Sequence, residues 1–502
     1  MPITDIGMEA EFTLERERRG VVDESPFRIL AIGDWGGDGA RKGLNERRPI
    51  EVDRDNIDEV IAKMKASVNL SFDDGSSLSL EFNSLDDFHP DEIFRRVPMF
   101  SQLRDLRKRL KGSDTFNAAA REAREMFGIN KTESESAASP ASDEPASDNL
   151  LDAILTKPSG GGSAPKPGVS GELGGLIKDL VRPHLVSIDE NEQGSLVSAV
   201  DEATSQLMRK ILHHRDFQTL EAAWRGLFFL VKRADTSSDL KVFAFDISKE
   251  ELAGDLKTAE SLSGTTLYKV LVRDAVETPG GEPWSLVCAN YAFEPDVDDV
   301  ALLMRVSKIS EAARAPFVSH MRPDVIGVHS LAEKADPAVW KTPPDNDAGK
   351  LWFALRGQPE SEFLGMTIPR FLVRLPYGAD TDPLETFNFE EFPGIPVHDD
   401  YLWSNGCFAV SMLYARSFAA YGWDMGKRLI QDIEGLPVHV YESEGETVYK
   451  PCAEIQMTDV GVQRLMEYGL MPLVSFKASD RVKLARFQSI KDPDKGLRGR
   501  WN

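Results

Sequence analysis

Residues 131–171 constrain the architecture of this chain more than any other segment, because they cannot form a folded core. They include KTESESAASPASDEPAS and KPSGGGSAPKPGVSG, which are rich in Ser, Ala, Pro and Gly. Such sequences bury too little apolar area to offset the entropy lost on ordering, as is typical of flexible linkers. We therefore predict two domains, residues 1–130 and 172–502, joined by this linker. The apolar island at residues 150–155 is either a short docking helix or a chance cluster.

The first part has the pattern of an α/β domain. Met8, Ala10, Phe12 and Leu14 alternate with polar residues, which predicts a strand with one apolar face. Apolar runs and spacings predict four further elements: a buried strand at 27–32, a helix at 56–64, a hairpin of strands 68–72 and 77–82, and a helix whose stripe is Phe100, Leu103, Leu106 and Leu110.

The second part contains one unusually clear helix after Ile211. Its apolar residues recur at spacings of three and four and form one wide stripe: Phe217, Leu220, Trp224, Leu227, Phe228 and Val231. Asp216 is a plausible N-cap, because its carboxylate can accept the unpaired N–H groups of the first turn. These residues are candidate core and packing positions, which favours assembly over catalysis.

The remaining segments of the second part alternate between helical and strand patterns. Helices are predicted at 176–212, 297–315 and 402–421, strands at 240–246, 267–273, 285–289 and 367–375, and a hairpin at 438–441 and 448–452. The predicted fold class is α/β (α+β), with mixed β-sheets and packed helices.

Composition excludes several classes of protein. The chain has 59 Lys and Arg against 82 Asp and Glu, a net charge of −23, which gives no general attraction to nucleic acid or anionic lipid. Three widely spaced cysteines fit a reducing compartment. The N-terminus lacks the pattern of a signal peptide. The sequence contains no run of about 18 apolar residues, so no membrane-spanning helix is predicted. We expect a cytoplasmic protein.

One glycine-rich loop could bind phosphate. Residues 33–39, GDWGGDG, follow a predicted strand, but a P-loop needs Gly, four residues and then Gly-Lys-Ser/Thr. That ending is absent, and Asp34 and Asp38 place negative charge where phosphate would lie. A structural turn, in which Gly33, Gly36 and Gly37 supply positive φ, is the better interpretation. A nucleotide-dependent enzyme using this loop stays as the alternative from another class.

Other catalytic signatures are incomplete. His214-Arg215-Asp216 imitates a kinase catalytic loop, but Glu221 stands where that loop needs Asn. No His-Glu-x-x-His, Cys-x-x-Cys or Gly-x-Ser-x-Gly spacing occurs. Cys407 and Cys452 lie in apolar surroundings typical of small core residues. We predict no enzyme activity, no cofactor and no metal site.

The ordered blocks of the second part resemble a known family. ILHHRDFQTLEAAWRGLFFLVKR, DISKEELAGDL, GGEPWSLVCANYAFE, LGMTIPRFLVRLPYG, YLWSNGCFAV and PLVSFKASD resemble the large subunit of the type VI secretion contractile sheath (TssC/VipB class). PFRILAIGDWGG, IEVDRDNIDEVIAKM and LEFNSLDDFHPDEIFRRVP resemble the small subunit (TssB/VipA class) more loosely. The chain therefore resembles both sheath subunits, fused through residues 131–171.

The resemblance implies a mechanical rather than a chemical role. Sheath subunits pair, stack helically around an inner tube, exchange strands with their neighbours and store contraction energy in subunit packing. The implied partners are other copies of the chain, an inner tube protein, the baseplate and an AAA+ ATPase that dismantles contracted sheath. The alternating strand at Met8, Ala10, Phe12 and Leu14 suits donation to a neighbouring sheet edge.

One departure from the family pattern leaves an alternative open. The family's large subunit continues past the block matching PLVSFKASD into strands that complete the wall, whereas this sequence stops at Asn502. Either another protein supplies those strands, or the chain is a non-polymerising paralogue that acts as a cap, a baseplate-proximal component or a regulator.

Overall fold

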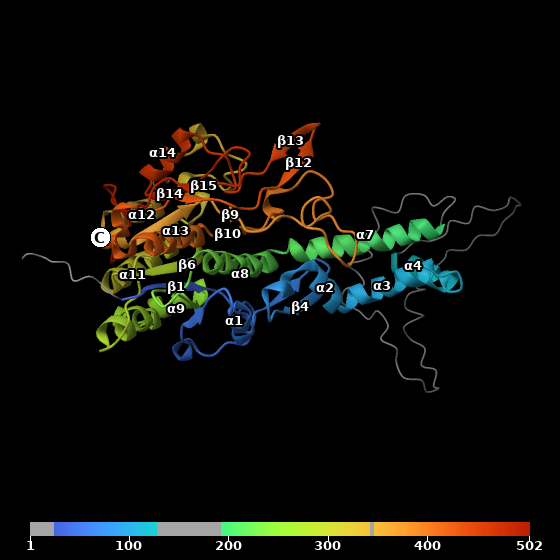
Figure 1. Ribbon diagram of the computed structural model, residues 1–502, viewed down its shortest axis with the longest axis horizontal. Coiled ribbons are helices and arrows are strands. Elements are labelled where there is room, and N and C mark those ends of the chain that lie inside the picture. Colours follow the sequence, from blue (N-terminus) through green and yellow to red (C-terminus); the bar gives the residue numbers. More distant parts are fainter. Residues whose placement is uncertain (1–24, 128–191, 342–345) are drawn as a thin grey trace, which may run out of the picture.

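The computed structural model describes residues 25–127, 192–341 and 346–502, and its centre is a nine-stranded sheet (Figure 1). The strand order is β11-β15-β14-β8-β7-β6-β1-β5-β2. In chain order these strands are β1 (Phe27–Gly33), β2 (Ile50–Val52), β5 (Leu240–Asp246), β6 (Leu286–Phe293), β7 (Phe317–Met321), β8 (Leu364–Ile368), β11 (Asp432–Ile433), β14 (Leu470–Ser475) and β15 (Val482–Leu484).

Strand β1 lies in the middle of this sheet, between two strands that follow it by more than 200 residues in sequence. It runs parallel to β5, with Phe27 opposite Leu240 and Gly33 opposite Asp246, and parallel to β6 on its other side. The strands from β5 to β14 are all parallel, and antiparallel strands β2, β15 and β11 close the two ends. Both sequence parts therefore build one sheet.

The sequence of β1, apolar except for Arg28, follows from its position. Phe27, Ile29 and Ala31 pack into one hydrophobic core, whereas Leu30 and Ile32 pack into the other. A strand of a parallel sheet that is covered on both faces needs apolar side chains on both sides, so its sequence does not alternate. The predicted strand at 27–32 is confirmed.

Helices cover both faces of the sheet. Helices α1 (Ile57–Met64), α8 (Arg215–Arg233) and α13 (Gly406–Tyr421) contribute to the first core. The second core is covered by α9 (Lys249–Thr258), α11 (Val297–Ala313), α12 (Asp347–Gly357) and α14 (Asp459–Glu467). The predicted mixed α/β class is confirmed.

A helical arm projects from this body (Figure 1). It consists of α3 (Pro98–Lys111), α4 (Phe116–Phe127) and the far half of α7 (Glu192–Leu212), and α2 (Pro90–Arg96) leads into it. Leu106 and Leu110 of α3 join Leu196 and Val200 of α7 in the first core. The arm, like the sheet, is built from both sequence parts.

Two hairpins confirm predictions from alternation. The first joins β3 (Ser67–Ser71) to β4 (Ser77–Glu81), and the second joins β12 (Val440–Ser443) to β13 (Glu446–Tyr449). A further small sheet pairs β9 (Phe371–Leu372) with β10 (Trp403–Ser404).

Two strand predictions were wrong. Residues 267–273 are helical, in α10 (Thr266–Tyr268) and the π-helix Lys269–Glu277, because the Thr265 hydroxyl accepts from Tyr268 N and starts a helix. A short apolar run does not distinguish a buried helix from a strand. The strand predicted at 367–375 is split into β8 and β9 at Pro369, which has no N–H to donate to a ladder.

The predicted boundaries at 131 and 171 and the island at 150–155 lie outside the described residues. The division into two domains therefore stays a prediction.

Candidate functional site

The seam between the two sequence parts is the candidate functional site, and helix α8 lies along it. Phe217, Trp224 and Leu227 are fully buried, Leu220 is 4% exposed, and Phe228 is partly buried against the same core. They contact residues of the first part: the Phe217 ring centroid lies 6.0 Å from that of Phe82 and 5.9 Å from that of Phe88.

Two tryptophans join the parts at the centre of the seam. The ring centroids of Trp35 and Trp224 lie 5.2 Å apart. Trp224 Nε1 donates to Trp35 O at 3.1 Å, and Trp35 Nε1 donates to Phe245 O at 3.2 Å. Both indole N–H groups are thus satisfied inside the core, where an unpaired donor would be costly.

Helix α8 begins two residues earlier than it would with Asp216 as its N-cap. Its first residue is Arg215, and the imidazole of His214 caps it by accepting from Asp216 N at 3.3 Å. The predicted cap was therefore wrong, because a histidine preceding the helix supplies the acceptor in place of the carboxylate.

Three backbone amides of the glycine-rich loop at 33–39 are occupied by carboxylates of the chain itself. Asp246 Oδ1 accepts from Trp35 N at 2.9 Å and Gly36 N at 3.2 Å, and Asp34 Oδ1 accepts from Gly37 N at 2.8 Å. Acceptors that already hold these N–H groups take the place a phosphate oxygen would need. The loop fastens β1 to β5 and offers no phosphate cradle.

The three glycines of the predicted turn differ in conformation. Gly37 has φ +57°, and a Cβ there would lie 2.3 Å from Ser67 O. Gly33 and Gly36 are not among the positive-φ glycines. Only Gly37 therefore needs the freedom of glycine for its φ.

An ion cluster beside the loop also crosses the seam. The guanidinium of Arg47 holds Glu251 in a bidentate pair, with Nη2–Oε1 at 2.6 Å and Nη1–Oε2 at 2.8 Å. Hydrogen bonds from Arg47 lower the pKa of Glu251. Bidentate geometry of this kind fixes orientation as well as adding energy.

A second, buried ion network lies where α8 meets residues 374–391. Arg374 Nε lies 3.0 Å from Glu221 Oε1, and Arg374 Nη1 lies 2.8 Å from Glu391 Oε2. Burial alone would raise the pKa of Glu391, but the charge and hydrogen bonds of Arg374, together with His213 Nε2 at 3.4 Å, outweigh it and lower that pKa to about 2. Burial raises the pKa of Tyr377, which bonds the neighbouring Arg225, to about 12.

This network was missed from sequence, although a signal for it was present. Glu221 lies four residues after Phe217 and three before Trp224, so it stands on the apolar stripe of α8. Arg374 interrupts the apolar run FLVRLP. A charge at a core-facing position requires a buried partner, but which residue supplies it depends on the tertiary fold.

Within the described ranges, no group of three His, Cys, Asp or Glu side chains is placed to hold a metal ion, and no helix is long and apolar enough to cross a bilayer. Cys407 and Cys452 are buried, and Cys407 Sγ lies 3.5 Å from Cys288 Sγ. Burial raises the pKa of the Cys407 thiol, which disfavours the nucleophilic thiolate. The candidate strand-exchange residues Met8, Ala10, Phe12 and Leu14 lie outside the described residues.

Comparisons with known proteins match both parts of the chain. Residues 194–491 match the family described as EvpB/VC_A0108, tail sheath N-terminal domain, and residues 9–127 match the family described as Type VI secretion system, VipA, VC_A0107 or Hcp2. The chain is 37% identical over 312 residues to the type VI secretion system sheath protein TssC1 of Pseudomonas aeruginosa, covering 60% of this chain and 61% of that relative. The chain therefore belongs to the type VI secretion sheath family, and it carries a VipA-type and a VipB-type segment in one polypeptide.

Proposed function

We propose that this chain is a structural subunit of a type VI secretion-like contractile sheath. It assembles with copies of itself around an inner tube in the cytoplasm and stores contraction energy in subunit packing. Baseplate contact and dismantling by an AAA+ ATPase belong to the same proposal, and no bond-making chemistry is required of the chain.

One observation carries the proposal: β1 of the VipA-type segment is hydrogen-bonded between β5 and β6 of the VipB-type segment. A two-part building block is thus formed within one chain, with fixed stoichiometry. The paired tryptophans Trp35 and Trp224 and the ion pair between Arg47 and Glu251 hold the two segments together.

Electron microscopy of the purified full chain tests the proposal. We expect tubes or stacked rings that grow with protein concentration. Discrete particles of one size at every concentration and salt condition would contradict it and favour the non-polymerising paralogue. Added nucleotide is expected to leave assembly unchanged and not to be hydrolysed by the chain. Saturable nucleotide binding that is lost in Gly36→Ala would favour the enzyme alternative.

The strand-exchange residues give a sharper variant. Phe12 belongs to the apolar face of the alternating segment and Thr13 to its polar face. We expect Phe12→Lys to abolish assembly while leaving the melting temperature of the subunit unchanged, because the donated strand would lose an apolar contact with its neighbour. Thr13→Lys is the matched control and should assemble as the wild type does.

A further inference from the structure

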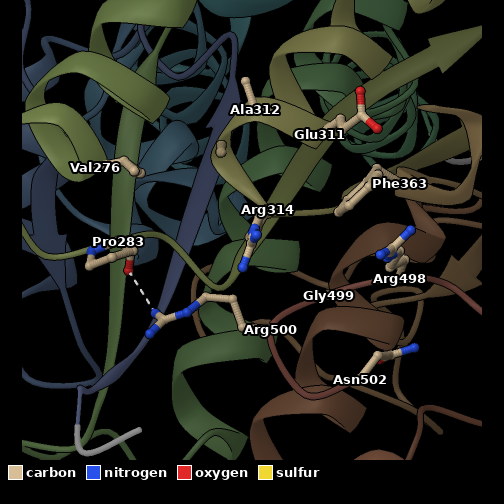
Figure 2. A pocket seen from close by; sticks show the side chains of 11 residues that line it. Val276, Pro283, Glu311, Ala312, Arg314, Phe363, Arg498, Gly499, Arg500 and Asn502 are labelled. Carbon is tan, nitrogen blue, oxygen red and sulfur yellow. Dashed lines mark hydrogen bonds between the residues drawn. The ribbon is translucent and has the colours of Figure 1, made fainter. Parts of the chain in front are cut away.

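The C-terminal residues and the β12–β13 hairpin are attached to the body by different kinds of contact. Residues 498–502 meet the end of α11 around a pocket of about 810 Å³ (Figure 2). There Arg498 lies 3.4 Å from Glu362, and Arg500 donates to Pro283 O at 3.4 Å. Arginine and glutamate side chains keep their charges near neutral pH, so these contacts do not change there. The hairpin, by contrast, is held through histidines.

The β12–β13 hairpin lies at the edge of the body and is held at its base (Figure 1). None of its residues from Val440 to Tyr449 is buried. The next pair below the ladder is His439 and Lys450, where Lys450 N donates to His439 O at 2.9 Å. His439 is buried and Lys450 is partly buried. The attachment of the hairpin therefore depends on how these two base residues pack.

An aromatic shelf, formed by Tyr401 and Trp403, receives the base of the hairpin. With Leu372 these residues make a small third cluster, separate from the two main cores. Tyr401 Oη and His439 Nδ1 lie 2.6 Å apart, and Lys450 Nζ lies 5.0 Å from the Tyr401 ring centroid and 5.6 Å from that of Trp403. A segment held by so few apolar contacts detaches at a lower free energy than global unfolding requires.

His398 connects Lys450 to a buried carboxylate. Its Nδ1 lies 2.8 Å from Lys450 Nζ, and its Nε2 lies 3.3 Å from Glu454 Oε1. An ammonium group has only donors, so Nδ1 accepts and the ring proton lies on Nε2, towards the carboxylate. A second ring proton would lie on Nδ1 and face the ammonium of Lys450 with no acceptor between them. The docked geometry is therefore specific for a neutral imidazole.

The charged neighbours of this site do not titrate near neutral pH. Burial raises the pKa of Glu454, but the charge of Arg370 and its hydrogen bonds outweigh that effect and lower the pKa. Burial lowers the pKa of Lys450, and the charges of Glu454 and Asp399 oppose that shift. Further groups act on the two histidines or on Glu454: Asp400 on the turn of His398, Glu391 and Tyr441 beside His439, and His320 near Glu454. The imidazoles at the hairpin base are therefore the groups that take up protons in mild acid.

We propose that His398 and His439 form an acid-sensitive latch at the base of the β12–β13 hairpin. When His398 takes up a proton at Nδ1, Lys450 loses its acceptor and faces a second positive charge, so its ammonium leaves the aromatic shelf. A proton on His439 adds a charge to the same apolar site. Both events favour a form in which the base of the hairpin is detached and solvated. The latch concerns one chain and its own hairpin, and it does not rest on the proposed function.

The direction of the pH dependence follows from His439. Burial lowers the pKa of His439 from its ordinary 6.5, so the docked form binds this proton less tightly than the detached form does. Docking is therefore favoured above pH 6.5 and weakens as the pH falls below it. Burial lowers the pKa of His320 to about 4, so that residue stays neutral while the latch opens.

Amide hydrogen exchange measures release of the hairpin in the full chain, at a concentration at which it sediments as a single subunit. After correction for the intrinsic pH dependence of exchange, we expect the protection of residues 440–449 to fall at least tenfold between about pH 7.5 and about pH 5. Helix α9, which packs on the second core, is the internal control and should keep its protection. In the double variant His398→Gln with His439→Gln, the fall should be less than twofold. A tenfold fall in the double variant, or none in the wild type, would overturn the inference.

Histidine NMR tests the exclusion between His398 and Lys450 without requiring release of the hairpin. Lys450→Met removes the ammonium that faces Nδ1, so His398 should take up its proton at a pH about one unit or more higher than in the wild type. Lys477→Met changes an exposed lysine and is the matched control, with no expected effect on the titration of His398. An unchanged titration of His398 in Lys450→Met would contradict the latch and leave the proposed function standing.

Discussion

At the scale of single residues, the seam is held by buried groups whose partners come from distant parts of the chain. Trp224 and Trp35 are fully buried, and so is Glu221. These groups stabilise the fold because each indole N–H and most of the buried charges have a partner. Removal of one partner leaves the other buried and unsatisfied.

Trp224→Ala is expected to destabilise the chain by about 3–5 kcal/mol, the usual cost of emptying a core aromatic site. The indole is fully buried and also bonds Trp35 O, so the substitution leaves both a cavity and an unpaired carbonyl. Urea unfolding measures the loss. Phe228→Ala, on the same helix at a partly buried position, is the control and should cost less; equal losses would contradict this account.

Glu391 makes the free energy of unfolding depend on pH. Its folded-state pKa of about 2 lies below its ordinary value of 4.5, so the charged carboxylate contributes stability above pH 4.5 and loses it as the pH falls towards 2. We expect the advantage of the wild type over Glu391→Gln to shrink by about 3 kcal/mol across that window. Denaturant unfolding at several pH values measures it.

Glu390→Gln is the matched control for that series. Glu390 is the exposed neighbour of Glu391, and its carboxylate accepts from Ala379 N at 2.9 Å. Its difference from the wild type should be smaller than that of Glu391→Gln at pH 7. A Glu391→Gln difference that stays constant between pH 7 and pH 3 would contradict the role assigned to the buried pair.

At the scale of elements, the turn after β1 decides how the first part enters the sheet. The strand ends at Gly33. In the turn that follows, backbone amides donate to the carboxylates of Asp246 and Asp34, and Gly37 then pairs with Ser67 in an isolated β-bridge. The sequence predicted a turn here in which three glycines supply positive φ, and of these only Gly37 has it. It did not indicate that a carboxylate of β5 would hold the turn, because Asp246 is more than 200 residues away.

Gly37→Ala is expected to lower stability by about 1–3 kcal/mol, since the residue has positive φ and a Cβ would meet Ser67 O. Gly43→Ala is the control: its φ is −55°, and nothing lies within 4 Å of its Cβ position. That variant should be neutral or slightly more stable. Thermal unfolding of both measures the difference, and equal melting temperatures would show that the turn relaxes at no cost.

At the scale of the whole molecule, the two sequence parts share a sheet, a core and an arm. The Arg107 guanidinium of α3 pairs with Asp201 of α7, with Nη2–Oδ2 at 2.9 Å. Together with the pairing of β1 to β5 and β6, this ion pair ties the two parts to each other at both the sheet and the arm. A cut between them should therefore not separate them.

Cleavage at a protease site introduced within residues 131–171 tests this directly. We expect both fragments to co-elute on gel filtration at micromolar concentration and to separate only in denaturant, because β1 would have to leave the middle of the sheet. Uncut protein carrying the same site is the control. Two separate peaks in native buffer would contradict an intramolecular pairing of the parts.

The sequence by itself determined the local elements and the family, because both depend on patterns within short segments. The apolar run at 27–32, the stripe of α8 and the two hairpins are set by periods of two and 3.6 residues, which need no knowledge of distant partners. Only the tertiary structure decided that β1 lies between β5 and β6 and that Arg374 pairs with Glu221 and Glu391. Each of these depends on which surfaces meet, and burial against distant segments overrides local propensity.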